Sequence, residues 1–331
     1  MVKIKIFFSI LLIFACCINC TTPTGKIPVV FDTDTNNEVD DQHAMAYLLM
    51  NGKTFDVKGI TINATSGGGD VNEQYAEADR IIRLLNLTDV TVKKGANGRF
   101  EAISPTLTQK DFDGFDAVNF IIAQAKAMKN HKLVLIAVGK LTNVALAIKK
   151  DPSITPKIRL VWLGANYPEP GEYNLENDIP SMNYLLDTDI DFEMVTVRYG
   201  KPSGTAAVVA IKDDILRIMP GKGPVAKAPV TGRHGKNFRC FGDYSVNLFE
   251  ECDCHGYPPG RSLFDMAAVA IVKNPSWAEV KTIPAPIMQN RRWVERPNNK
   301  RTIKLWENFN AKAILDDFYQ TMTHYTLIEV K

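Results

Sequence analysis

The chain has 331 residues, of which 45% are hydrophobic, so it is long enough to bury a large core. It carries 39 basic and 37 acidic residues, and leaving out Lys3 and Lys5 makes the two signs equal. This balance argues against a basic surface for nucleic acid, and we expect no nucleic acid among the partners.

The first twenty residues resemble a targeting segment rather than part of a fold. Two lysines precede an apolar run from Ile6 to Ala15, which has the length of a signal peptide and is too short to span a membrane. Ile13-Phe14-Ala15-Cys16 resembles a bacterial lipobox, in which the cysteine is lipidated after cleavage. We therefore expect export to the periplasm, with a lipid anchor as the only contact with the membrane. The alternative is an ordinary cleaved leader.

Strands and helices alternate through the first two thirds of the chain. Short apolar runs predict buried strands, and longer segments with apolar spacing predict helices. The predicted strands are Ile27–Asp32, Asp56–Ile62, Val90–Lys94, Lys132–Val138, Ile158–Leu163 and Phe192–Thr196. The predicted helices are Asp40–Met50, Asn72–Leu85, Asp116–Met128, Asn143–Lys149 and Ile211–Met219. This order is typical of an α/β fold with an open, mostly parallel sheet and helices on both faces.

The last third of the chain is less regular. Residues 220–229 are rich in Pro, Gly and Lys and predict a loop, and residues 233–260 have no clear period. The elements predicted after them are a helix at Asp265–Val272, strands near Val280–Ile287 and Thr302–Leu305, and a final helix from Asn308 to about Met322. We expect a single domain over residues 26–331, with a lid-like insertion, small C-terminal strands and a terminal helix.

Three cysteines follow the leader. In an oxidising compartment Cys240 could pair with Cys252 or with Cys254, which would leave one thiol free. The sequence Cys252-Asp253-Cys254-His255 also resembles half of a zinc site, but no second ligand pair stands at zinc spacing.

Acidic residues are concentrated directly after the first predicted strand. Five of them fall within ten positions, namely Asp32, Asp34, Glu38, Asp40 and Asp41. They stand at the carboxyl end of a strand, where open α/β sheets bind ligands. So many carboxylates repel one another unless a cation neutralises them, and hard oxygen ligands favour Ca²⁺ or Mg²⁺.

Two other kinds of acidic site fit less well. An EF-hand would use Asp32 and Asp34, but it needs a glycine where Asn37 stands and a glutamate where His43 stands. A phosphatase of the haloacid dehalogenase type also begins with a strand and Asp-x-Asp. It needs an acidic pair after a later strand, and Gly-Ala-Asn follows Leu163 instead.

The acidic segment resembles the metal-binding signature of the inosine–uridine-type nucleoside hydrolases, which runs strand, Asp-x-Asp, gap, Asp-Asp. The gap here, residues 35–39, resembles the longer variant of some bacterial branches. Further segments resemble family motifs in the same order: Gly139-Lys140-Leu141-Thr142-Asn143-Val144-Ala145, Leu163-Gly164-Ala165-Asn166, Glu172-Tyr173-Asn174 with Asp178, Phe264-Asp265 before Ala-Val-Ala, and Glu307-Asn308-Phe309. The resemblance spans roughly residues 27–322 and implies the fold described above.

The resemblance implies a role for each matching residue. Ca²⁺ would be bound by Asp34, Asp41, Asp265 and the backbone carbonyl of Val138, and Asp34 would also be the general base. The residues implied to hold the ribose are Asp40, Asn166, Glu172 and Asn174. The family's asparagine after the second strand could be Asn63 or Asn72, or be replaced by Asp70. Asp32 is expected to cap the loop or to orient Asp41. Asn143 could have a functional role, or it could only cap the helix that follows it.

The sequence differs from the family at a position that activates the leaving base in many members. Many purine-cleaving members place a histidine directly before the last metal-binding aspartate, and Phe264 stands there instead. A departing base needs a proton or another form of activation. His234, His255 or Tyr257 could supply it, or Phe264 could stack on the base.

The implied function is calcium-dependent hydrolysis of the N-glycosidic bond of a nucleoside-like small molecule, through an oxocarbenium-like transition state. The rivals are a ribose- or nucleoside-binding protein of the same fold that has lost catalysis and, more distantly, a phosphatase. The resemblance is also compatible with a homo-oligomer.

Overall fold

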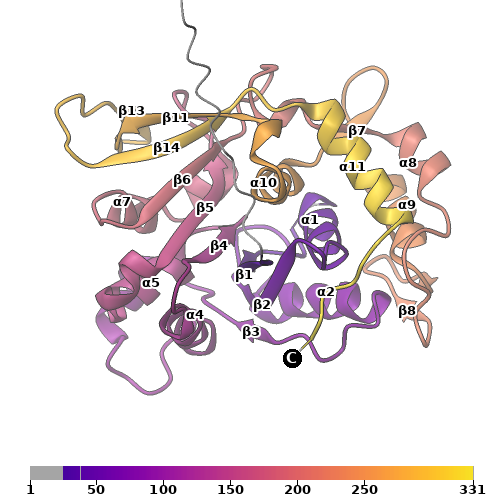
Figure 1. The fold of residues 1–331 in the computed structure, drawn as a ribbon, viewed down its shortest axis with the longest axis horizontal. Helices are drawn as coiled ribbons and strands as arrows, with labels where there is room; N and C mark the ends of the chain where they lie inside the picture. Colours follow the sequence, from indigo (N-terminus) through magenta and orange to yellow (C-terminus); the bar gives the residue numbers. More distant parts are fainter. Residues whose placement is uncertain (1–24, 38, 331) are drawn as a thin grey trace, which may run out of the picture.

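The computed structural model describes residues 25–37 and 39–330, so the predicted leader at residues 1–20 and Glu38 lie outside the described residues. An eight-stranded sheet runs through the centre of the molecule (Figure 1). Its strands are β1 (Ile27–Thr33), β2 (Phe55–Ile62), β3 (Val92–Lys94), β4 (Leu133–Ala137), β5 (Ile158–Ala165), β6 (Asp191–Thr196), β11 (Glu279–Pro284) and β14 (Thr302–Glu307). All six strands predicted before residue 200 are present.

The sheet is parallel except at one edge. Its strand order is β11-β14-β6-β5-β4-β1-β2-β3, and only β11 runs antiparallel to its neighbour. The chain leaves β1 toward β2 on one side and later returns to place β4 on the other side. This reversal creates a crevice beyond the carboxyl ends of β1 and β4, which is where doubly wound sheets bind ligands.

Helices cover both faces of the sheet, as predicted, because alternate residues of the central strands point to opposite sides. Val29 and Phe31 of β1 join one buried cluster, and Val30 joins the other. The first cluster includes residues of α1 (Val39–Leu49), α2 (Val71–Leu84), α8 (Lys212–Ile218), α9 (Phe241–Glu251), α10 (Phe264–Lys273) and α11 (Ala311–Thr323). The second includes residues of α3 (Phe100–Ile103), α4 (Phe115–Ala127), α5 (Thr142–Lys150), α6 (Tyr173–Asn177) and α7 (Ile179–Leu186).

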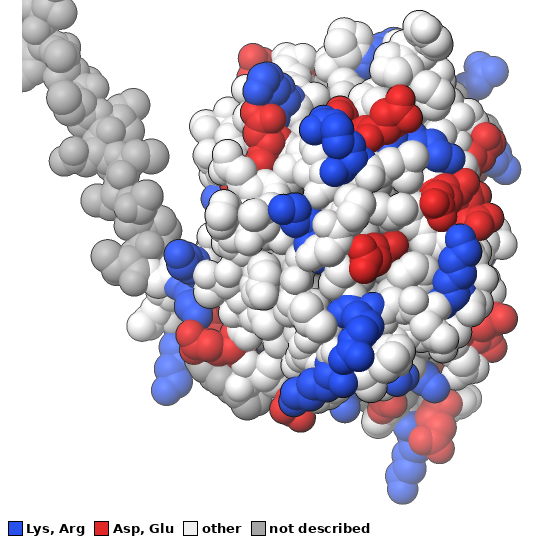
Figure 2. Space-filling model, turned by 90° about the vertical axis from the view of Figure 1, so that its right-hand side faces the viewer, with Lys and Arg blue, Asp and Glu red and all other residues white. Residues whose placement is uncertain are grey.

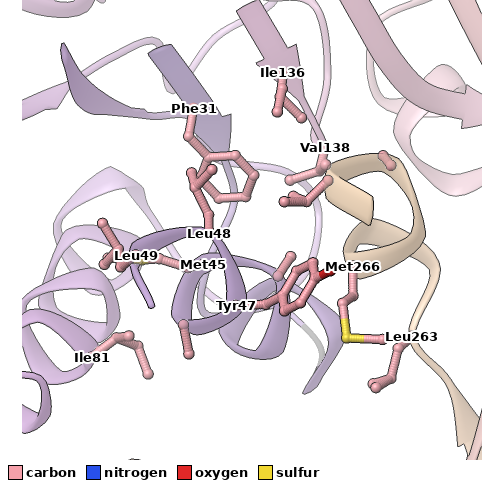
Figure 3. Packing of buried hydrophobic residues seen from close by; sticks show 14 of the residues in the cluster. Phe31, Met45, Tyr47, Leu48, Leu49, Ile81, Ile136, Val138, Leu263 and Met266 are labelled. Atoms are coloured by element: carbon pink, nitrogen blue, oxygen red, sulfur yellow. The ribbon is translucent and has the colours of Figure 1, made fainter. Parts of the chain in front are cut away.

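Helix α1 is the most deeply buried helix near the site, and every one of its residues is buried. Figure 3 shows Met45, Tyr47 and Leu48 of this helix among side chains of β1 and α10, including Phe31 and Met266. A helix enclosed on all sides by packed side chains has little freedom to shift. This packing fixes the first turns of α1 and α10, which carry four of the predicted site residues, namely Asp40, Asp41, Phe264 and Asp265.

The insertion is more regular than the sequence predicted. The segment expected to be irregular, residues 233–260, contains α9, an eleven-residue helix. It also contributes to two short antiparallel two-stranded sheets. One is the hairpin of β8 (Val230–Thr231) and β9 (Asn237–Phe238), and the other pairs β7 (Val209–Ile211) with β10 (Gly260–Ser262), which follows much later in the chain. Helix α9 has a mixed sequence with two glutamates at its end, and its burial against the rest of the fold stabilises it.

The C-terminal region follows the prediction with shifted boundaries. The strand expected over Val280–Ile287 ends at Pro284, and β12 (Ile287–Gln289) and β13 (Arg292–Val294) form a separate hairpin. The last helix begins at Ala311, because Asn310 caps it by accepting a hydrogen bond from the Ala313 backbone N–H.

The surface carries both signs of charge. On the face seen in Figure 2, basic and acidic side chains are interspersed among uncharged residues, as the equal counts of the two signs led us to expect. Among the described residues, no helix is both long and apolar enough to cross a membrane.

Candidate active site

A cavity of about 660 Å³ opens at the crevice beyond β1 and β4. Its walls come from the ends of strands, from the first turns of helices and from the insertion, so segments far apart in the sequence meet there. The lining residues are Asn37, Asp40, Asp41, Val138, Leu163, Glu172, Tyr173, Asn174, Tyr199, Gly200, Ala206, Val209, His255, Gly256, Gly260, Arg261, Ser262, Phe264 and Asp265. Most of the residues predicted to act on substrate or metal are among them.

Three carboxylates converge at the floor of the cavity. Asp40 and Asp41 lie in the first turn of α1, and Asp265 lies in the first turn of α10. One carboxylate oxygen of each lies within 4.8 Å of the other two, and all three side chains are buried. Because the N-terminal ends of both helices point into the crevice, their dipoles favour negative charge at this position. Asp40, which the resemblance assigned to the sugar, therefore also lies within the cluster of possible metal ligands.

Asp34 lies beside this cluster, in the turn that follows β1. Its Oδ2 accepts a hydrogen bond from Thr65, while its Oδ1 is buried and has no hydrogen-bond partner among the described residues. Gly139 lies against this carboxylate, since a Cβ atom at that position would come within 2.7 Å of Asp34 Oδ1. A buried carboxylate oxygen without a partner is costly, and a bound cation or water would satisfy it.

Two neighbouring polar residues of β1 have different roles. Asp32 accepts hydrogen bonds from Thr61 at 2.6 Å, Asn63 at 2.8 Å and Asn143 at 2.8 Å. Of the two alternatives given for Asp32, orienting Asp41 is the one that the hydrogen bonds do not support, because the Thr33 hydroxyl donates to Asp41 at 2.5 Å. In this way Asp32 ties β1 to β2 and to α5.

Asn143 and the three alternatives for the asparagine after the second strand also occupy defined places. Asn143 lies in the first turn of α5, and besides its bond to Asp32 it accepts the Ala96 N–H. Asn63 is buried, and its Oδ1 has no hydrogen-bond partner. Asp70 caps α2 at the surface, and Asn72 is exposed beside it. Asn63 is therefore the one of the three that lies close to Asp34, since both flank Gly139.

The buried acids shift one another's protonation. Burial, joined in the case of Asp40 by the charge of Asp34, raises the pKa of Asp34 and of Asp40 to about 7. Burial, followed by the charges of the neighbouring aspartates, raises the pKa of Asp41 and of Asp265 well above the ordinary value. These raised pKa values mean that the cluster is unfavourable when all of its carboxylates are ionised. A bound cation would favour the ionised forms again.

The opposite wall carries Glu172 and Asn174. Glu172 caps α6 by accepting the Leu175 backbone N–H at 2.9 Å, and burial raises the pKa of its carboxyl to about 7. Asn174 donates to the carbonyl of Val138 at 2.9 Å and to that of Leu163 at 3.2 Å. Because a carbonyl oxygen has two lone pairs, Val138 keeps one that a cation can use.

Aromatic and basic residues form the outer part of the cavity. Phe264 packs edge to face against Tyr199, with ring centroids 5.8 Å apart. His255 and Arg261 lie in the same wall, whereas Tyr257 is fully exposed at the tip of the 255–260 turn. His234 lies in a neighbouring cavity and contacts Asn247 at 3.4 Å. Of the side chains considered for activating the base, His255 and Phe264 therefore line the cavity.

Asn166 lies outside the cavity wall. Its side chain closes the short loop after β5 by donating to the Pro170 carbonyl, and it accepts the Tyr199 backbone N–H at 3.0 Å. The amide is thus used by its own loop and by the segment that follows β6. Asn166, which the resemblance assigned to the ribose, is not among the residues that line the cavity.

Several contributors to the site escaped the sequence analysis. Thr65, Tyr173 and Tyr199 were assigned no role, and of the three only Tyr173 lies in a segment that resembles a family motif. Tyr173 stands between two predicted residues, and its hydroxyl accepts the Gly67 backbone N–H at 2.6 Å. Its position inside the Glu-Tyr-Asn segment was the only sequence signal among the three.

The donor set fits a hard divalent cation. The atoms available are carboxylate oxygens of Asp40, Asp41 and Asp265, the unpartnered Asp34 Oδ1 and the Val138 carbonyl oxygen. All are oxygens, which Ca²⁺ and Mg²⁺ prefer over the nitrogen and sulfur ligands typical of zinc. Among the described residues this is also the one group of three or more acidic, histidine or cysteine side chains close enough together to hold a metal ion.

Comparison with known proteins agrees with this geometry. The sequence profile of the family described as inosine-uridine preferring nucleoside hydrolase matches residues 29–316. The chain is 24% identical over 233 residues to the pyrimidine-specific ribonucleoside hydrolase RihA of Salmonella newport (strain SL254), which covers 66% of this chain and 67% of the relative. It is 28% identical over 140 residues to the probable uridine nucleosidase 1 of Oryza sativa subsp. japonica, covering 40% of this chain and 41% of that one.

Solved structures share the fold at lower identity. The plant nucleoside hydrolase PpNRh1 superposes with a TM-score of 0.70 at 16% identity and covers 90% of this chain and 99% of its own. The inosine-uridine preferring nucleoside hydrolase of Bacillus anthracis gives a TM-score of 0.65 at 17% identity, covering 89% and 99%.

Proposed function

Because the chain belongs to the inosine-uridine preferring nucleoside hydrolase family, we propose that it hydrolyses the N-glycosidic bond of ribonucleosides with the help of Ca²⁺, releasing ribose and a free base. The observation that carries the proposal is the convergence of Asp40, Asp41 and Asp265 at the floor of a cavity of about 660 Å³, beside the unpartnered Oδ1 of Asp34. Such a cavity has room for a ligand the size of a nucleoside.

Calcium would be held by Asp34, Asp41, Asp265 and the Val138 carbonyl, with Asp40 close enough to contribute. When bound, the ion supplies the positive charge that keeps these acids ionised and makes a neighbouring water more acidic. The remaining chemistry belongs to the side chains of the protein.

Asp34 is the proposed general base. Its Oδ1 has no partner, so it is free to take the proton of the attacking water, while Thr65 holds Oδ2 in place. Asp40 would accept a hydrogen bond from a ribose hydroxyl on the same side. Fixing the water and the sugar in this way removes much of the entropy cost of bringing them together.

Glu172 and Asn174 would hold the sugar from the opposite wall, since both line the cavity. Phe264 and Tyr199 offer aromatic surface for the base. The position before Asp265 carries no proton donor, and His255 is the lining residue that could protonate the leaving base.

A nucleoside panel tests the proposal directly. Purified protein, incubated with uridine, cytidine, inosine, guanosine and adenosine in the presence of Ca²⁺, should release ribose, measured as reducing sugar. Release from none of them would contradict hydrolysis. Binding of these nucleosides by calorimetry without ribose release would support the binding-protein alternative, which the phenylalanine at position 264 favours. Release of phosphate from a chromogenic phosphate ester would support the phosphatase alternative instead.

We also propose export and lipid anchoring through the leader at residues 1–20. The support is the sequence pattern alone, namely a charged start, an apolar run and Cys16. Expression with a radiolabelled fatty acid in a bacterial host should label the wild-type chain and leave the Cys16→Ser variant unlabelled. Labelling of both would contradict a lipid on Cys16.

A further inference from the structure

Two thiols at the end of α9 take no part in the proposed hydrolysis. The Sγ atoms of Cys252 and Cys254 lie 2.9 Å apart, and both point toward the carbonyl oxygen of Phe249, at 3.7 and 4.0 Å. Both side chains are half-buried and pack against the larger hydrophobic cluster. The two sulfurs are therefore held side by side by the fold.

Regular structure would keep these sulfurs apart. Residues i and i+2 of a strand share a face but are separated by about 6.6 Å, and in a helix they do not face each other. Here the chain turns sharply where α9 ends, fixed by the hydrogen bond of 3.0 Å from Cys252 N–H to the Leu248 carbonyl. On the other side, His255 and Gly260 exchange two backbone hydrogen bonds of 2.9 Å. These bonds hold the intervening segment in its bend.

The pair is open to small molecules. Cys252 lines a second cavity of about 430 Å³, which shares Asn37, His255 and Arg261 with the active-site cavity. Arg233 and His234 line it as well. A small reagent that enters this cavity therefore meets a thiol at the rim of the active site.

The expected pairing with Cys240 is ruled out in this structure. Cys240 precedes α9 and Cys252 follows it, and the eleven residues between them span about 16 Å at 1.5 Å per residue. A disulfide needs Cα atoms within about 7 Å. Zinc is also excluded as an occupant of the pair, since no third ligand among the described residues converges on these thiols.

We propose that Cys252 and Cys254 form a redox-active dithiol at the rim of the active-site cavity, which a low-molecular-weight disulfide converts to an intrachain disulfide. The sulfurs are already close to the bonded distance of about 2.05 Å, so closing the bond needs little movement of the chain. This site is independent of the proposed hydrolysis, and its test does not use catalytic activity.

The exchange is balanced in two steps. One cysteine loses its proton, and its thiolate attacks the external disulfide, which forms a mixed disulfide and releases one thiol. The second cysteine then loses its proton and attacks the protein sulfur of that mixed disulfide, releasing the second external thiol. Two protein thiols are oxidised to one disulfide, and the external disulfide is reduced to two thiols.

The surroundings of Cys252 bear on how fast the exchange runs. Burial, and then the hydrogen bond with Cys254, raises the pKa of the Cys252 thiol to about 12. Because the thiolate is the attacking form, we expect the exchange to become faster as the pH rises.

Peptide mapping tests the proposal on the full chain. The folded protein is equilibrated with defined ratios of oxidised to reduced glutathione, its free thiols are alkylated, and it is cleaved after Glu251 and Arg261. The peptide 252–261 then contains both cysteines, while Cys240 lies in another peptide. We expect this peptide to become unalkylated and two hydrogens lighter on oxidation, and dithiothreitol to reverse the change.

The controls distinguish a disulfide that the fold favours from the ordinary reactivity of two nearby thiols. Cys254→Ser should lose the internal disulfide, whereas Cys240→Ser should leave it unchanged. The free synthetic peptide 252–261 should need a glutathione ratio about tenfold more oxidising for half conversion, because it lacks the fold that holds the sulfurs together. Full alkylation of both thiols in the oxidised protein, a cross-link to Cys240, a stable glutathione adduct on the wild type, or equal conversion of the free peptide would each overturn the proposal.

Discussion

The side-chain amide of Asn174 donates a hydrogen bond of 2.9 Å to the carbonyl oxygen of Val138. This bond joins a residue of the predicted sugar wall to a predicted metal ligand, and the same amide also contacts the Leu163 carbonyl at 3.2 Å. Asn174 therefore links the ends of β4 and β5 at the point where the site is built.

Replacing Asn174 with leucine should destabilise the protein. Two buried carbonyl groups would lose their donor, and such losses lower the free energy of unfolding by about 2–4 kcal/mol together. Urea denaturation measures the change. Asn119→Leu is the matched control, since Asn119 makes a similar bond to the Phe115 carbonyl on the exposed face of α4, and we expect a change below about 0.5 kcal/mol there. Equal effects of the two variants would contradict a linking role for Asn174.

Replacing Asp34 with asparagine should slow the chemical step. The amide keeps the size of the carboxylate but cannot accept the proton of the water, so we expect kcat to fall by at least about 10²-fold. Steady-state ribose release measures this. Asp316→Asn changes an exposed carboxylate on α11 that pairs with Lys312, and it should leave kcat unchanged. Wild-type kcat in the Asp34 variant would place the base elsewhere.

A methyl group at Gly139 should disturb the site more than the fold. The added Cβ would come within 2.7 Å of both Asp34 Oδ1 and Asn63 Nδ2, so the carboxylate must move. We expect kcat to fall about tenfold or more, because a displacement of about 1 Å can reduce rates strongly. Gly25→Ala is the control, because a Cβ atom at that position would have no atom within 4 Å among the described residues, and it should leave kcat unchanged. Unchanged activity in Gly139→Ala would contradict the prediction, because it would mean that the methyl group does not displace the Asp34 carboxylate.

Removing calcium should destabilise the protein. Asp34, Asp41 and Asp265 are buried and raise one another's pKa, so the folded chain is less stable without a cation to neutralise them. We expect a chelator to lower Tm in scanning calorimetry, and Ca²⁺ at about 100 times its Kd to restore about 2.7 kcal/mol.

Asp265→Asn should remove most of this calcium-dependent shift, because it removes one negative charge from the ligand set. Lys312→Gln, at an exposed pair, should retain the full shift. A Tm that responds equally to Ca²⁺ in both variants would exclude Asp265 from the ion site.

Glu193 should make stability depend on acid pH. This buried carboxylate is ion-paired with Arg159 and Lys304 and accepts the Trp306 indole N–H, and these contacts outweigh burial and lower its pKa from 4.5 to about 2. Between pH 4.5 and 2 the unfolded chain therefore binds more protons than the folded one, and stability is lost as the pH falls through this window.

The shift corresponds to about 3 kcal/mol at neutral pH. Glu193→Gln should therefore lower the free energy of unfolding by about 2–3 kcal/mol at pH 7 and flatten its decline between pH 4.5 and 2, as measured by urea denaturation at several pH values. A variant that keeps the steep decline would show that other carboxylates cause it.

The sequence alone determined the fold class and the family. Strands that are buried on both faces of a sheet appear in the sequence as short apolar runs. The Asp-x-Asp segment marks the end of β1, and the Asp-Asp segment marks the start of α1. Local patterns of this kind follow from backbone geometry and burial, so all six strands predicted in the first two thirds were predictable. That Asp265 joins the acidic residues after β1 was implied by the resemblance to the family.

Only the tertiary structure decided how side chains from distant segments meet. The sequence motif could not show that Asn166 bonds to Pro170 and to the Tyr199 backbone. Nor could it show that Thr33 rather than Asp32 contacts Asp41, or that Tyr199 packs against Phe264. Helix α9 has weak local signals because its stability comes from burial against α1 and α2, and its length separates Cys240 from Cys252. Contacts of this kind depend on the path of the whole chain, since neither hydrogen-bond partners nor distances between segments are encoded in the local spacing of residues.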